Sequence, residues 1–339
     1  MRGLVKLAHG AGGTLMEQAI LDFTAKFSTR SALDGVGIDA FDDGATLKLG
    51  EHEVVATMDG HTVNPIFFPG GDIGRLAICG AVNDLAMMGA KPVAILDSVM
   101  VEEGFPFSDL DKIAESMEKV ASETAIAIIG GDFKVMPKGT LDKIVIATCG
   151  LGLAERGKVV LDSGARPGDK VIVTGSIGDH GIALLSAREQ LGFDTDLESD
   201  VRPIWKTVEA ALSVGGVSSM KDATRGGLAS TLNDIACKSH VSIWLDDEQL
   251  PIKGAVSAAS EMLGLNPLEI TCEGVAIICV EGKFANDALD AVASTPYGRE
   301  ASIVGEVRAE RPGYVLLKTE VGGTRVVEKP LGELIPRVC

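Results

Sequence analysis

Apolar and polar residues follow two distinct patterns along this chain. Short runs of consecutive apolar residues predict buried β-strands, whereas apolar residues that recur every three or four positions predict amphipathic helices. In the first half, strands are expected at 54–58, 92–100, 125–129 and 143–153, and helices at 14–27, 72–88 and 108–124. In the second half, strands are expected at 170–174, 241–245, 275–280 and 301–307, and helices at 180–190, 203–213, 228–238, 254–263 and 283–293. Because both halves mix helices and strands, we expect a layered α+β or α/β protein.

The stretch at 154–169 breaks this alternation with Arg-Pro-Gly-Asp, which predicts a domain boundary. A chain of 339 residues also suits two domains of ordinary size, each with its own core. We therefore expect a glycine-rich segment and helix at 1–34, an α+β domain at 35–154, a second α+β domain at 155–310, and a flexible, mobile tail at 311–339.

The charge of the chain excludes several classes of partner. With 31 Lys and Arg against 48 Asp and Glu, the formal net charge is −17, so there is no basic surface for nucleic acid or anionic membranes. The first residues lack the pattern of a secretory signal, and the apolar run at 125–129 is too short to cross a bilayer. We expect a cytoplasmic protein with neither nucleic acid nor membrane as a partner.

Five of the six cysteines differ from the sixth in their sequence surroundings. Five lie in or beside apolar stretches, which predicts small buried side chains in a reducing compartment. Cys339 instead ends the chain, and the last ten residues could extend over roughly 33–36 Å. The segment 311–339 carries five basic and three acidic residues, so the acidic body should attract it. A terminal thiol of this kind can be carried into a distant site.

A glycine-rich segment at 9–13 precedes the first predicted helix. Glycines let backbone N–H groups approach phosphate oxygens, and the helix that follows adds its positive end. The segment is neither a Walker A loop nor a G-x-G-x-x-G motif, and a helix-capping turn explains it equally well.

Acidic residues recur in turns and near the ends of predicted strands or helices. Carboxylates from separate segments could converge on Mg²⁺ bound to phosphates, although Asp also caps turns without any ligand. Asp84 differs because a carboxylate near a helix C-terminus opposes the helix dipole and needs a compensating cation. The acidic residues in question are Asp42, Asp43, Asp59, Asp84, Asp132 and Asp222.

Two further side chains suit acid–base or phosphate chemistry. Lys134 follows Asp132 by two residues and could neutralise phosphate charge, or it could be an ordinary solvated lysine. Glu273 lies between two apolar runs, where partial burial would raise the pKa of its carboxyl and suit it as a base. A glutamate that only faces a turn is the alternative.

Together these segments resemble the HypE hydrogenase maturation factors, which are carbamoyl dehydratases of the aminoimidazole ribonucleotide synthetase superfamily. The resemblance spans essentially the whole chain, and the terminal Pro-Arg-x-Cys is its most specific part. Ala223 stands where the family usually has Pro, and Val338 where Ile is frequent. The matching segments are 9–13, 42–45, 58–60, 70–92, 130–135, 222–227 and 336–339.

The resemblance implies a two-domain α+β fold in which strands of the N-terminal domain join those of a second subunit to form a dimeric β-barrel. It also implies ATP and Mg²⁺ as cofactors. The residues implied for nucleotide binding are Gly10, Gly12, Gly13, Asp42, Asp43, Asp59, Asp84, Asp132, Lys134 and Asp222. Those implied for the metal are Asp43, Asp59, Asp84 and Asp222.

The implied reaction takes place on the protein's own tail. A carbamoyltransferase, HypF, loads a carboxamide onto Cys339, ATP phosphorylates the carboxamide oxygen, and loss of phosphate with an N–H proton leaves a thiocyanate. The cyanide passes to a HypC–HypD iron carrier for [NiFe]-hydrogenase. Lys134 would neutralise phosphate charge. Glu273 is the expected base and His9 the alternative.

Other functions of the same superfamily are weighed by what they would require. A selenophosphate synthetase would want a reactive cysteine in the segment 9–13, which has none. A thiamine-monophosphate kinase would not need a terminal thiol. A carrier with a degenerate nucleotide site would not need Asp43, Asp59, Asp84, Asp222 and Lys134.

Overall fold

The computed structural model describes residues 4–189, 191 and 196–331. Its first domain contains a five-stranded sheet in the order β1-β2-β7-β5-β6, in which only β5 and β6 are parallel. The strands are β1 (Ala45–Leu49), β2 (His52–His61), β5 (Lys91–Glu102), β6 (Ala127–Met136) and β7 (Ile144–Glu155). The helices are α1 (Thr14–Thr24), α2 (Ile73–Met87) and α3 (Phe107–Thr124), and β3 (Phe67–Phe68) pairs with β4 (Gly71–Asp72).

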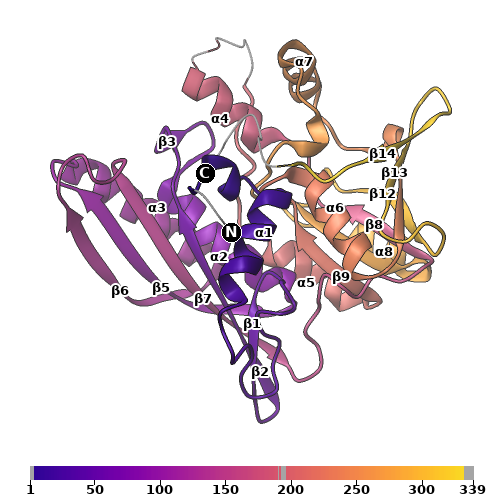
Figure 1. The fold of residues 1–339 in the computed structure, drawn as a ribbon, viewed down its shortest axis with the longest axis horizontal. Helices are drawn as coiled ribbons and strands as arrows, with labels where there is room; N and C mark the ends of the chain where they lie inside the picture. The colour runs from indigo at the N-terminus through magenta and orange to yellow at the C-terminus, as the bar shows by residue number, and fades with distance from the viewer. Residues whose placement is uncertain (1–3, 190, 192–195, 332–339) are drawn as a thin grey trace.

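Helix α2 connects the two domains. Asp72 caps its N-terminus, where its side chain accepts hydrogen bonds from the backbone N–H groups of Gly74 and Arg75 at 2.7 and 3.1 Å. Apolar residues occur all round the helix because it is buried on both sides. Its Leu76 packs in the first domain, whereas Met87 packs against the second. Figure 1 shows α1 and α2 between the two sheets.

The second domain contains a seven-stranded sheet in the order β14-β13-β10-β12-β8-β11-β9, in which only β10 and β13 are parallel. Its strands are β8 (Asp169–Val173), β9 (Val217–Asp222), β10 (Ser242–Asp246), β11 (Ala276–Glu281), β12 (Ser302–Arg308), β13 (Val315–Lys318) and β14 (Thr324–Val327). Its helices are α4 (Asp179–Glu189), α5 (Trp205–Val214), α6 (Gly227–Lys238), α7 (Gly254–Leu263) and α8 (Ala285–Ala293).

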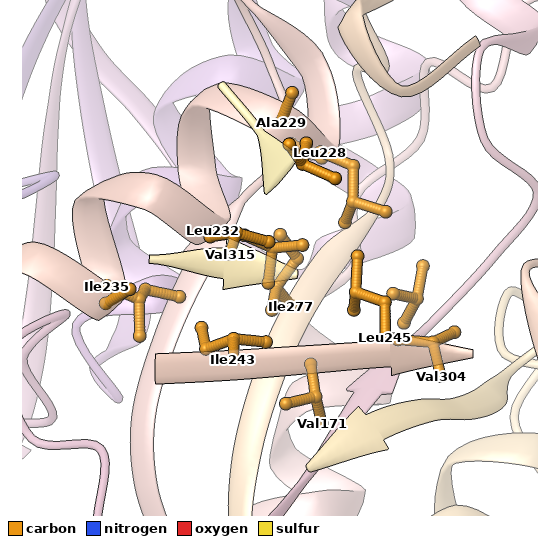
Figure 2. Close-up of a cluster of buried hydrophobic side chains, with 14 of the residues drawn as sticks. Val171, Leu228, Ala229, Leu232, Ile235, Ile243, Leu245, Ile277, Val304 and Val315 are labelled. Carbon is orange, nitrogen blue, oxygen red and sulfur yellow. The ribbon is translucent and has the colours of Figure 1, made fainter. Parts of the chain in front are cut away.

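Helices cover both faces of this second sheet. Successive strand residues point to opposite faces, so Ile277 of β11 packs beneath α6 while Ile278 packs with α5 and α8. Leu228, Leu232 and Ile235 recur along one side of α6 and face the sheet (Figure 2). The unbroken apolar runs in these strands follow from burial on both faces.

The structure corrects three expectations. The strand expected at 125–129 runs instead from Ala127 to Met136, because Ala125 has a left-handed backbone conformation that ends α3. The mobile tail was expected to begin at 311, but β13 and β14 lie beyond that point. They are paired strands of the second sheet and contain buried residues such as Leu316. Strands β1, β9, β13 and β14 were not expected from the apolar pattern. Cys339 lies outside the described residues.

The five-stranded sheet does not close on itself in the described part of the chain. Its edges are β1 and β6, and β6 is the outermost strand of the first domain (Figure 1). Residues of β6 are exposed along nearly its whole length, including Ile129, Phe133 and Val135. In the part of the chain that the structure describes, every helix is too short or too polar to cross a membrane.

Candidate active site

A cavity of about 910 Å³ lies where the two domains meet. The loop before β1 contributes Asp42 and Asp43, and β2 contributes Asp59. Helix α2 adds Asp84 near its C-terminus, and β9 ends in Asp222 at the same cavity. The fold therefore brings together acidic residues that are widely separated in the sequence.

Most, but not all, of the site residues expected from the sequence line this cavity. Those that do are Gly12, Gly13, Asp42, Asp43, Asp59, Asp84, Asp222 and Glu273. His9 and Gly10 lie in a 3₁₀ turn outside the lining, where His9 Nδ1 is 2.9 Å from the backbone nitrogen of Lys6. Asp132 and Lys134 lie on the exposed edge strand β6, outside the lining of this cavity.

The glycine-rich segment packs against the start of helix α6. Gly12 has a φ of +84°, and a Cβ there would lie 2.4 Å from Cβ of Arg225, so only glycine fits. The Ser230 hydroxyl donates to the Gly12 carbonyl at 3.1 Å and ties the segment to α6. Gly226 and Gly227, both with positive φ, form the turn that begins the helix. Backbone N–H groups and a helix N-terminus therefore meet at the cavity, an arrangement that suits an anion.

Two lysines hold the acidic loop in place. Lys221 on β9 binds Oδ1 of Asp43 and lies 3.4 Å from Asp162, which Lys238 contacts at 2.5 Å. Burial alone would lower the pKa of Lys221, but Asp43 and Asp162 outweigh it and raise that pKa well above its usual value. The second oxygen of Asp43, Oδ2, is buried and has no hydrogen-bond partner among the described residues.

The remaining carboxylates are crowded together. Burial, followed by the charges of Asp43 and Asp59, raises the pKa of Asp222 to about 7. Burial and the charges of Asp59, Asp222 and Asp43 raise the pKa of Asp84 well above its usual range, even though the Thr57 hydroxyl donates to it at 2.5 Å. Burial, with Asp162 and Asp43, likewise raises the pKa of Asp42 to about 7. The cavity therefore has an excess of negative charge that a cation would relieve.

The donor set suits Mg²⁺ bound together with phosphates. Among residues 4–189, 191 and 196–331, no three His, Cys, Asp or Glu side chains are arranged to hold a metal alone. Mg²⁺ usually takes one or two carboxylates and completes its shell with water and phosphate oxygens. The unpartnered Oδ2 of Asp43 is an oxygen of the required kind.

The backbone of Glu273 is hydrogen-bonded to residues of both domains. Its backbone N–H donates to the Asp200 carboxylate at 3.2 Å, and its carbonyl accepts from Asn83 Nδ2 of α2 at 2.9 Å. The side chain is only 9% exposed but lines the cavity. Burial, then Asp200 and Asp222, raises the pKa of Glu273 well above its usual value. A carboxyl in this setting suits proton transfer.

Lys221 and Asn83 were not expected as site residues from the sequence. Each adjoins a residue that was singled out, since Lys221 precedes Asp222 and Asn83 precedes Asp84. Their roles depend on partners more than a hundred residues away, which adjacency in the sequence does not reveal.

The cysteines are more varied than expected. Cys79, Cys272 and Cys279 are buried as small apolar residues. Cys149 is half-buried and lines the cavity, whereas Cys237, on α6, is exposed, so the expectation of burial was wrong there.

Comparison with known families agrees with this architecture. The AIR synthase related protein family matches residues 41–154 with its N-terminal domain and residues 166–318 with its C-terminal domain. Carbamoyl dehydratase HypE of Rhizobium leguminosarum is 43% identical, over 99% of this chain and 95% of its own. The same protein of Azotobacter vinelandii is 41% identical, over 99% of this chain and 98% of its own.

Solved structures show the same relationship. A HypE chain in a HypE–HypF complex superposes with a TM-score of 0.86 at 41% identity, covering 94% of this chain and all of that one. A HypE structure in complex with ATP superposes with a TM-score of 0.82 at 36% identity, covering 99% of this chain and all of that one. From its fold, its acidic cavity and these full-length matches, the chain belongs to the AIR synthase related family and, within it, to the HypE carbamoyl dehydratases.

Proposed function

We propose that this protein uses Mg-ATP to dehydrate a carboxamide carried on Cys339 to a thiocyanate, the source of the cyanide ligand of [NiFe]-hydrogenase. The observation that carries the proposal is one cavity that gathers the Gly12 turn, several carboxylates and the buried Glu273. The chain belongs to a family with members named carbamoyl dehydratase, and the structure of a related HypE contains ATP.

The tail can bring its cysteine to this cavity. Lys329 lines the cavity, and the carbonyls of Pro330 and Leu331 accept hydrogen bonds from the backbone of Thr14 and Leu15 at 3.1 and 3.3 Å. The chain therefore leaves the described structure beside the site. The eight residues 332–339 can span roughly 26–29 Å when extended, which is enough to return the terminal thiol.

The polar groups divide into two sets with different tasks. Backbone N–H groups of Gly12 and Gly13 suit the phosphates, and Asp43, Asp59, Asp84 and Asp222 suit a phosphate-bound Mg²⁺. The metal, when bound, neutralises charge on the transferred phosphoryl group.

Glu273 supplies the base that the reaction needs. A carboxamide oxygen leaves poorly, so transfer of the terminal phosphoryl group of ATP to it, with loss of one N–H proton, gives an S-bound imidoyl phosphate and ADP. Breaking the C–O bond then releases phosphate, and the second N–H proton leaves as the C≡N bond forms. Glu273 accepts that second proton, since His9 lies outside the cavity.

A second subunit would complete the site. β6 exposes Phe133 and Val135 on an unpaired edge, as expected of a strand that another chain covers. Pairing with a second copy would form the dimeric barrel. It would also offer Asp132 and Lys134 of one protomer to the nucleotide in the cavity of the other.

The partners follow from the chemistry. A carbamoyltransferase of the HypF type loads Cys339, and the structure of a related HypE–HypF complex supports this partner. A HypC–HypD iron carrier receives the cyanide. The acidic chain and its use of ATP support a cytoplasmic location.

Mass spectrometry of the C-terminal peptide tests the proposal. With the carbamoyltransferase, carbamoyl phosphate and ATP, the wild-type peptide should first gain a carboxamide and then lose water. Cys339→Ala should give neither product, and Cys237→Ala, which removes an exposed thiol on α6, should behave as wild type. A dehydrated product from the Cys339→Ala protein would disprove the proposal.

A further inference from the structure

A buried histidine lies directly behind Glu273. His180, in the first turn of α4, is fully buried, and its Nδ1 is 2.7 Å from Oγ of Ser199. Its Nε2 is 4.0 Å from Oε1 of Glu273 and has no hydrogen-bond partner among the described residues. A buried polar atom without a partner is costly, so its direction toward the Glu273 carboxylate requires an explanation.

The hydrogen bonds around Ser199 suit one tautomer of this histidine. The Ser199 hydroxyl oxygen accepts the backbone N–H of Val201 at 3.1 Å. The proton of this hydroxyl can point to Nδ1 of His180, 2.7 Å away. With the Ser199 hydroxyl as the donor, Nδ1 is the acceptor and the ring proton resides on Nε2. Burial lowers the pKa of His180 to about 3, so the ring stays neutral and presents Nε2–H to Glu273.

We infer that His180 is a positioning residue for Glu273, because its Nε2–H can hold Oε1 and leave Oε2 to accept the substrate proton. This inference rests on the proposed function. The separation of 4.0 Å is longer than a hydrogen bond, but catalytic contacts often tighten when substrate binds. The proton moves from the substrate N–H to Oε2, while the imidazole keeps its own proton.

A hydrogen bond from His180 matters because the surroundings of Glu273 disfavour the ionised form of its side chain. Asp200 precedes α5, Asp222 ends β9, and Asp59 lies on β2, and all three act against the ionised form. Arg225, before α6, is a charged group that favours it. A neutral N–H donor stabilises the carboxylate without adding a charge that ATP or the metal would have to tolerate.

Replacing this donor should change a pH profile and not only a rate. Without Nε2–H, the Glu273 carboxylate loses a charge-assisted hydrogen bond, so the acidic limb of the rate profile should move to higher pH. At pH 7 the single-turnover dehydration rate should fall roughly ten- to a hundredfold and recover as the pH rises. A purely structural defect would lower the rate at every pH.

Single-turnover dehydration from pH 6 to 9.5 tests this inference, with Cys339 already loaded and Mg-ATP in excess. His180→Phe should shift the acidic limb upward, His180→Gln should restore part of it through its amide donor, and Ser199→Ala should shift it in the same direction by releasing the tautomer. Ser260→Ala, which removes a different buried hydroxyl, should leave the profile unchanged.

The outcomes separate the two claims. An acidic limb in His180→Phe identical to that of an active wild type would overturn the inference and leave the proposed function intact. If His180→Phe does not fold, as judged by circular dichroism, unshifted profiles in His180→Gln and Ser199→Ala overturn it equally. A wild-type protein that does not dehydrate its loaded cysteine would refute the proposed function itself.

Discussion

Lys221 binds one carboxylate oxygen of Asp43 and leaves the other buried and without a partner among the described residues. The two residues come from different domains, Asp43 from the loop before β1 and Lys221 from β9. One contact thus joins the domains and orients an acidic side chain toward the cavity. Asp162, held by Lys221 and Lys238 together, completes the network.

Removing Lys221 should lower the stability of the folded protein. Lys221→Met leaves the buried Asp43 without its cation, which costs about 3 kcal/mol of unfolding free energy. Urea denaturation measures this loss. The double variant with Asp43→Asn should lose less unfolding free energy than the two single variants lose together, because the charge that needed the lysine is gone. Strictly additive losses would show that the pair is not coupled.

Asp84 should oppose stability in the free protein and support nucleotide binding. Because its neighbours repel its charge, Asp84→Asn should raise the melting temperature without ligand. It should also weaken Mg-ATP binding at least tenfold, which removes about 1.4 kcal/mol of ligand stabilisation. Thermal shifts with and without Mg-ATP provide both numbers. Asp287→Asn, at an exposed position on α8, is the matched control, and a full Mg-ATP shift in Asp84→Asn would contradict the assignment.

His180 should make the fold sensitive to acid. Its pKa is about 3 in the folded protein, against 6.5 for an ordinary histidine. Between these pH values the unfolded chain binds a proton that the folded chain does not bind. The stability that this depressed pKa supplies is present above pH 6.5 and is lost as the pH falls toward 3. The slope is about 1.4 kcal/mol per pH unit.

Asp200 has the opposite effect, because burial raises its pKa to about 6 and the folded protein then gains stability as the pH falls from 6 to 4. The histidine is therefore isolated by comparing unfolding free energies of wild type and His180→Gln at pH 4, 5 and 6. The advantage of wild type should shrink with acidification. A constant difference would mean that His180 is not buried as a neutral ring.

The edge strand β6 should govern assembly. Phe133→Glu places a charge on the exposed apolar edge and should convert a dimer to monomers in sedimentation velocity. Met262→Glu, which changes another exposed apolar residue, on α7, should leave assembly unchanged. If Asp132 and Lys134 act across the dimer, the monomeric variant should also lose Mg-ATP stabilisation. A Phe133→Glu protein that remains dimeric would exclude β6 from the interface.

Local patterns predict the parts of this fold that depend on local physics. The spacing of Leu228, Leu232 and Ile235 marks the buried side of α6 directly. Strand β14 has three exposed residues of four and no apolar run, so only its pairing with β13 defines it. The acidic residues could be named from their turns, but Lys221 and His180 could not, because their partners come from distant segments.

The fate of the carboxamide oxygen tests the central claim most directly. If ATP phosphorylates this oxygen, Cys339 loaded with an ¹⁸O-labelled carboxamide should release its label in inorganic phosphate during a single turnover. Mass spectrometry of the phosphate, with unlabelled carboxamide in ¹⁸O-water as the control, makes the measurement. The account predicts one labelled oxygen per thiocyanate formed. Label recovered in water, with none in phosphate, would contradict it.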